Sequence, residues 1–312
     1  MLAILLVVLP IFLVIGAGAA AVRGGVFADA GVDALMQFTT RVSVPCLLFT
    51  EMYRLSLGDA FEPGMLIAFY TGAFACFGLA VIAALRFGRK PGEAVAIGFS
   101  AYFSNTVLLG LPVMIRAYGD EATEPMFGLI AFHAPLLFAF GSVMMEVMRE
   151  EGGGAVQAAR RAFASIIRNA LMIGIGLGLI LNLLAAPLPA PALDALDLIA
   201  AASLPTALFA LGAAMTRYRI SDDLAWAGAL CALSLIVHPA IAYGLSVYVF
   251  ALDDAFLRAA VVTAAMPAGL NTYIFAVLHR RAEAITASAV LMGTALSVLS
   301  ISFWLAILGG AA

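Results

Sequence analysis

Two apolar stretches of the chain each carry an Asn-Thr step close to a proline. Residues 104–112 read SNTVLLGLP, and residues 266–272 read MPAGLNT. A proline inside a helix frees a backbone carbonyl, and an asparagine amide needs hydrogen-bond partners, so both are costly in hydrocarbon. Interrupted helices at corresponding places in two halves of a membrane chain are typical of a ligand site.

The two stretches therefore contain the candidate substrate-binding residues. These are Ser104, Asn105, Thr106, Pro112, Pro267, Ala268, Gly269, Leu270, Asn271 and Thr272. A half-helix that begins at either break would present free N–H groups and a positive dipole end, which suits a carboxylate without any cationic side chain. The alternatives are plain packing: a membrane asparagine often joins helices, and helical Ser and Thr hydroxyls often bond back to a carbonyl one turn earlier.

His133 is the candidate for proton coupling, because histidine titrates near neutral pH and ionisable groups inside a membrane commonly mark function. The alternative is a structural histidine held by hydrogen bonds. Arg41 stands one helical turn before Pro45. It would either attract an anion or extend its charge to the membrane surface.

Composition indicates a polytopic membrane protein and excludes a soluble globular domain. The chain of 312 residues is 64% hydrophobic and 11% charged, with a mean hydropathy of +1.08. The sequence holds no Ser/His/Asp set and no glycine-rich phosphate loop, and its three cysteines have no metal-ligand spacing, so an enzyme is not indicated. No cofactor, metal or nucleic-acid partner is expected.

The hydropathy pattern predicts an all-α protein with ten helices long enough to cross a hydrocarbon core about 30 Å thick. We expect them at residues 2–21, 33–56, 64–86, 93–116, 125–148, 165–185, 194–216, 224–249, 257–278 and 284–308. A linker at 149–164 separates residues 1–148 from residues 165–312. Basic residues concentrate in the odd-numbered loops, which predicts a cytoplasmic linker, outward-facing termini and a 5+5 inverted repeat.

Over nearly its whole length the sequence resembles the auxin efflux carrier family, which includes plant PIN carriers and bacterial malonate-type transporters. The resemblance rests on NTVLLGLP at 105–112, AMPAGL at 265–270 with FA at 275–276, VPCLLF at 44–49 and ALFALG at 207–212. It implies a scaffold domain of helices 1, 2, 6 and 7, and a transport domain of helices 3–5 and 8–10. Helices 4 and 9 would cross at Pro112 and Pro267, as in sodium/proton antiporters and bile-acid symporters.

The resemblance further implies a homodimeric carrier of a small organic anion in the cell (inner) membrane, working by elevator-type alternating access. The substrate would be a carboxylate such as malonate or an auxin-like acid, with H⁺ or Na⁺ as candidate coupling ion. Leu48 occupies a substrate-binding position where PIN carriers commonly have serine, which disfavours auxin itself. A sodium-coupled bile-acid-type symporter is the main alternative. A channel is less favoured, because the chain has no repeated selectivity elements.

Overall fold

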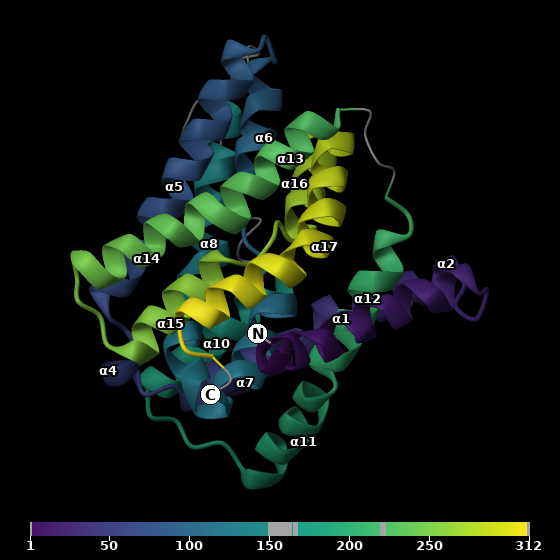
Figure 1. Ribbon diagram of the computed structural model, residues 1–312. Helices are drawn as coiled ribbons and strands as arrows, with labels where there is room; N and C mark the ends of the chain where they lie inside the picture. The colour runs from purple at the N-terminus through teal and green to yellow at the C-terminus, as the bar shows by residue number, and fades with distance from the viewer. Residues whose placement is uncertain (1, 149–163, 165–167, 219–222, 311–312) are drawn as a thin grey trace.

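The computed structural model describes residues 2–148, 164, 168–218 and 223–310, and these residues are almost entirely helical (Figure 1). The predicted linker at 149–164 and the start of the sixth predicted span lie outside the described residues, apart from residue 164. Within the described residues, six helical stretches are long and apolar enough to cross a membrane: Ile4–Arg23, Pro63–Arg86, Glu124–Val147, Ala190–Met215, Leu224–Tyr248 and Glu283–Ile307. The chain is therefore a polytopic, all-helical membrane protein.

Uninterrupted apolar sequence forms single helices close to the predicted bounds. These helices are α1 (Leu2–Arg23), α5 (Pro63–Arg86), α8 (Glu124–Val147), α10 (Ala170–Leu183) and α17 (Glu283–Ile307). The seventh predicted span consists of α11 (Ala190–Ala201) and α12 (Ser203–Met215). Two short elements, α4 (Leu57–Ala60) and η3 (Asp120–Thr123), lie in connections.

Three further spans contain a five-residue π-helical turn that ends just before a proline. The first runs through α2 (Asp29–Phe38), η1 (Thr39–Ser43) and α3 (Val44–Arg54). The second runs through η2 (Thr106–Gly110) and α7 (Leu111–Tyr118). The third runs through α13 (Leu224–Ala232), η4 (Leu233–Val237) and α14 (His238–Tyr248). A proline lacks an N–H and its ring clashes with the carbonyl one turn earlier, so the wider π turn lets the helix continue past Pro45, Pro112 and Pro239.

The fourth and ninth predicted spans are each broken. The fourth ends its first part with α6 (Pro91–Tyr102) and resumes at η2, whereas the ninth consists of α15 (Asp254–Ala264) and α16 (Leu270–His279). Pro267 lies in the second break, as the sequence predicts. The first break lies at residues 103–105, so the predicted interruption at Pro112 is wrong: the preceding π turn accommodates that proline inside a helix.

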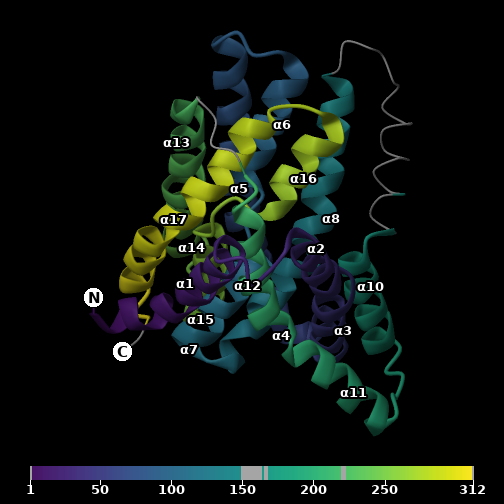
Figure 2. The same ribbon diagram turned by 90° about the vertical axis from the view of Figure 1, so that its right-hand side faces the viewer.

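The helices form two groups in both views (Figures 1 and 2). In one group α1 packs along α12 and α3 packs along α10, with α2 and α11 beside them. In the other group α5 packs on α6 and α14, while α17 packs on α13 and α16. The two termini lie near each other. The inverted repeat and the division into scaffold and transport domains stay predictions.

Glycine allows backbone contact within the first group. A Cβ on Gly18 or Gly212 would lie within about 2 Å of a carbonyl oxygen across the α1–α12 contact. On α10, a Cβ on Gly174 would lie 2.5 Å from the carbonyl oxygen of Pro45, and one on Gly178 would lie 2.5 Å from that of Phe49. These distances are too short for any side chain, so both helix pairs depend on glycine at the contact.

Candidate functional site

The two helix breaks meet and pair through their backbones. The Asn105 N–H donates a hydrogen bond to the Pro267 carbonyl at 2.9 Å, and the Gly269 N–H donates to the Phe103 carbonyl at 3.4 Å. Ser104 and Ala268 thereby form an isolated antiparallel bridge. Buried backbone groups that leave a helix need other partners, and each break supplies them to the other.

Gly269 permits this close approach. A Cβ built on Gly269 would lie 3.2 Å from the Asn105 Cβ and 3.3 Å from the Asn105 Cα. These contacts are tighter than side chains normally make, so a larger residue would press on Asn105. Pro267 fits the second break because only its carbonyl takes part in the pairing, so the N–H that proline lacks is not needed there.

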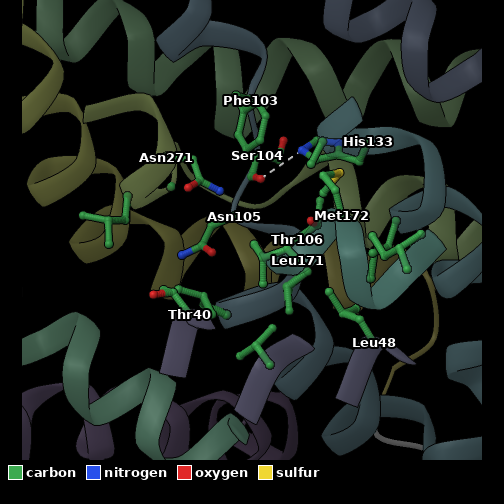
Figure 3. A pocket seen from close by; sticks show the side chains of 18 residues that line it. Thr40, Leu48, Phe103, Ser104, Asn105, Thr106, His133, Leu171, Met172 and Asn271 are labelled. Atoms are coloured by element: carbon green, nitrogen blue, oxygen red, sulfur yellow. Dashed lines mark hydrogen bonds between the residues drawn. The ribbon is translucent and has the colours of Figure 1, made fainter. Parts of the chain in front are cut away.

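A cavity of about 60 Å³ lies beside the paired breaks, between them and α3, α8 and α10. It has room for several water molecules or a small solute. Figure 3 shows the polar side chains Ser104, Asn105 and Asn271 gathered around the break, while Leu48, Leu171 and Met172 lie on another side. Thr40, Val44, Ile130, Ala134 and Ile175 also line the cavity.

Three polar atoms at this cavity are buried and have no hydrogen-bond partner among the described residues. They are the Ser104 Oγ, the Asn105 Nδ2 and the His133 Nδ1. Most buried polar atoms in proteins are hydrogen-bonded, because leaving one unpaired costs about 1–3 kcal/mol. Three of them at one cavity indicate a place that a polar ligand or water fills.

Two helix N-termini converge on the same cavity. The helix formed by η2 and α7 spans Thr106–Tyr118 and begins directly after Asn105, and α16 begins directly after Gly269. Thr106, Val107 and Leu108 of the first helix and Leu270 and Asn271 of the second line the cavity. The first N–H groups of a helix have no intrahelical acceptor and carry partial positive charge, so this end of the cavity favours an anion.

His133 reaches the break from α8. Its Nε2 lies 3.1 Å from the Ser104 carbonyl oxygen, and its ring packs on the rings of Phe103, at 4.8 Å between centroids, and Phe69, at 5.6 Å. The imidazole is 2% exposed. It therefore ties α8 to the break and also presents an unpaired nitrogen beside the cavity.

No Asp, Glu, Lys or Arg lines the cavity within the described part of the chain. Arg41 is exposed on η1 and is not among the lining residues. Any attraction for an anion must then come from helix dipoles, amide and hydroxyl donors and the histidine.

The cavity brings together eight of the residues predicted from the sequence: Leu48, Ser104, Asn105, Thr106, His133, Gly269, Leu270 and Asn271. Pro112, Pro267, Ala268 and Thr272 do not line it. Thr272 is buried, and its hydroxyl donates to the Gly269 carbonyl at 2.7 Å, as the packing alternative predicts. The sequence did not predict the apolar wall from α10, because apolar residues in an apolar helix carry no signal of a site. It also did not predict Thr40, whose hydroxyl donates to the Met36 carbonyl at 2.7 Å as helical threonines commonly do.

The fold and site define a class: a polytopic membrane protein with a small cavity, polar at one end, where two interrupted helices meet, as in transporters. The family model described as membrane transport protein matches residues 3–305, so the chain belongs to this family, the auxin efflux carrier family. This confirms the resemblance found in the sequence.

Two curated relatives align with most of the chain. An "Uncharacterized transporter" of Methanothermobacter thermautotrophicus is 24% identical over 286 residues, covering 91% of each chain. A "Putative malonate transporter" of Rhizobium meliloti (strain 1021) is 23% identical over 277 residues, covering 86% of this chain and 84% of the relative. The chain is accordingly a membrane transporter of this family.

Proposed function

We propose that the protein is a secondary carrier of a small organic anion, a carboxylate such as malonate or an auxin-like acid, which binds in the cavity at the paired breaks. The observation that carries the proposal is the set of unpaired polar atoms at this cavity together with two helix N-termini. Transport rather than catalysis is the activity, in keeping with the family.

A carboxylate fits the donors available. Its two oxygens accept hydrogen bonds, and the Asn105 amide, the Ser104 hydroxyl and the free N–H groups of α16 all donate. Hydrogen bonds to a charged group contribute about 1.5–3 kcal/mol each. Each such bond lowers the free energy of the bound carboxylate, although burying an ion costs several kcal/mol and no cationic side chain lines the described cavity.

The cavity offers one polar end and an apolar wall formed by Leu48, Leu171 and Met172. A single carboxylate at the polar end would leave the rest of a small substrate against this wall. Malonate is a natural first substrate to test because one relative carries that name. Propionate is its matched comparison, because it replaces one carboxylate by a methyl group.

The proposed mechanism is elevator-type alternating access. The glycine contacts of α1 with α12 and of α3 with α10 suit a rigid scaffold, and the cavity lies between α3 and α10 on one side and the breaks on the other. Movement of α5–α8 and α13–α17 past that scaffold would expose the cavity to each side in turn. The proposal includes the inverted repeat, outward-facing termini, a location in the cell membrane and a homodimer, the last on family grounds alone.

The test is uptake into proteoliposomes of the purified full-length protein, using labelled malonate and labelled propionate. We expect saturable uptake that unlabelled substrate inside the vesicles accelerates, and no competition by neutral propionamide. Uptake that stays linear with concentration would indicate a channel. No saturable uptake of either acid under an imposed proton, sodium or potential gradient would contradict the proposal.

A further inference from the structure

The hydrogen bond of His133 determines which ring nitrogen can receive a proton. The Ser104 carbonyl can only accept, so the His133 Nε2, 3.1 Å away, must carry a hydrogen. In the neutral ring the Nδ1 is then an unprotonated acceptor. This atom is buried without a partner among the described residues, and His133 lines the cavity. A proton that joins the ring must bind at Nδ1.

Among the described residues, none around His133 would balance a positive charge. On α5 it meets Phe69, and Tyr70 of that helix directs its hydroxyl to the Leu129 carbonyl at 3.4 Å. Behind Phe69 lies His238 of α14, whose Nε2 is 3.1 Å from the Phe69 carbonyl oxygen. The described lining residues from α3, α10, α16 and the breaks are uncharged. An imidazolium beside the empty cavity would be a buried, uncompensated charge, which costs free energy.

We propose that the transported anion is itself the counter-ion, so that His133 takes up one proton on Nδ1 when a carboxylate occupies the cavity. This inference rests on the proposed function. The proton comes from solvent and forms an N–H bond at Nδ1, while the carboxylate stays ionised. Anion and proton bind and cross together as an ion pair, because each lowers the cost of burying the other.

Proton uptake and anion affinity are then linked. Each binding event that takes up one proton makes the apparent affinity fall about tenfold for each unit by which pH rises. The ion pair also makes proton-coupled symport the mode of transport: a monocarboxylate moves without net charge.

The test is calorimetric titration of the purified full-length protein with propionate and with malonate at neutral pH, in buffers of different ionisation enthalpy. The dependence of heat on buffer counts the protons taken up. We expect about one proton for each anion in the wild type. The His133→Gln variant keeps an amide N–H for the Ser104 carbonyl, and we expect it to bind with no proton uptake and no pH dependence.

His238→Gln is the matched control. His238 is equally buried and also directs its Nε2 to a backbone carbonyl, but it does not line the cavity, so the proton count should stay near one. A second readout needs no variant: the saturable part of propionate uptake, which protein-free vesicles lack, should be accelerated by an inward proton gradient and should carry no current.

Anion binding without proton uptake in the wild type would overturn the inference and leave the proposed function intact. The same holds if affinity depends on Na⁺ instead, or if the proton count survives in His133→Gln and vanishes in His238→Gln. A wild-type protein that binds neither acid would contradict the proposed function itself.

Discussion

At the scale of single residues, the site combines paired helix breaks with unpaired side chains. The two breaks pair with each other through the backbone N–H groups of Asn105 and Gly269. The Ser104 hydroxyl and the Asn105 amide, in contrast, have no partner in the described structure. Their donors are therefore held in place by the backbone and remain free for an anion, which is the condition for a preorganised site.

Asn105→Ala should weaken carboxylate binding while leaving the protein folded. The variant removes an amide donor to a charged ligand, worth about 1.5–3 kcal/mol, so we expect an increase in Kd of about 10-fold to 100-fold. Titration calorimetry measures the change. The control is Ser246→Ala on α14, which also removes a buried polar group without a partner but lies away from the cavity. Equal losses in both variants would argue against a site at Asn105.

Gly269→Ala should impair binding by displacing Asn105, although glycine itself offers no side chain to the ligand. The added methyl group meets the Asn105 Cβ at 3.2 Å and must push that residue or open the backbone bridge. Overpacking of this kind costs about 1–3 kcal/mol, so we expect weaker binding together with a lower melting temperature. Gly244→Ala is the control, because no described atom lies within 4 Å of its new methyl group. Unchanged affinity in Gly269→Ala would mean that the bridge does not position the site.

Residue types alone predicted Ser104, Asn105, Thr106 and Asn271, which line the cavity, because such groups are costly in hydrocarbon. They did not locate the first break. Pro112 was the natural candidate, yet the helix is interrupted at residues 103–105, where Asn105 bonds across to Pro267. That bond joins residues far apart in the sequence, and no local propensity encodes it. The hydrogen bond from His133 to the Ser104 carbonyl could not be predicted from the sequence for the same reason.

At the scale of elements, π-helical turns accommodate three prolines, and glycines allow close contact between helices. Three prolines follow π-helical turns, which widen the helix without ending it. Close contact is handled by glycine: on α10, the sequence GIGLG places Gly174 and Gly178 against α3, while Gly176 between them has no described atom within 4 Å of a built Cβ. Two glycines of one motif thus have a structural role that the third does not share.

Gly178→Ala and Gly176→Ala should therefore shift stability in opposite directions. The first methyl group would lie 2.5 Å from the Phe49 carbonyl oxygen, so α10 and α3 must separate, at a cost of about 1–3 kcal/mol. The second meets nothing and removes the helix penalty of glycine, a gain of about 0.5–1 kcal/mol. Thermal unfolding in detergent distinguishes them. Similar melting temperatures for the two variants would contradict the packing of this pair.

Hydropathy predicted most element bounds well, because apolar length decides which segments cross a membrane. The last span, expected at 284–308, is the helix Glu283–Ile307. The fourth, expected at 93–116, is two helices. Hydropathy averaged over a whole span does not show this break, because Ser104 and Asn105 are flanked by apolar residues on both sides.

At the scale of the whole molecule, the proposed alternating access requires the two helix groups to move past each other. They touch where Arg116 of α7 donates its Nε–H to the Val7 carbonyl of α1 at 2.9 Å. Cysteines introduced at these two positions in a chain lacking Cys46, Cys76 and Cys231, then joined by a short cross-linker, should abolish uptake of labelled malonate and propionate. Binding should persist, because the cavity is not at this contact.

The matched control joins two positions within one group. Asp33 of α2 and Arg217, which follows α12, form an ion pair with 2.5 Å between Oδ1 and Nη1. Cysteines cross-linked there should leave uptake near the level of the unlinked variant. If the Val7–Arg116 cross-link transports as fast as this control, the proposed relative movement of the two groups is wrong.

The transported anion should occupy the cavity at the paired breaks and should therefore protect a cysteine placed there from modification. In the chain lacking native cysteines, Val107→Cys, at a residue that lines the cavity, would be modified by a thiol reagent with and without malonate or propionate. We predict that the transported acid slows modification, with half-maximal protection near the concentration that half-saturates uptake, and that propionamide does not. An unchanged rate of modification at a saturating concentration of a transported acid would contradict the claim.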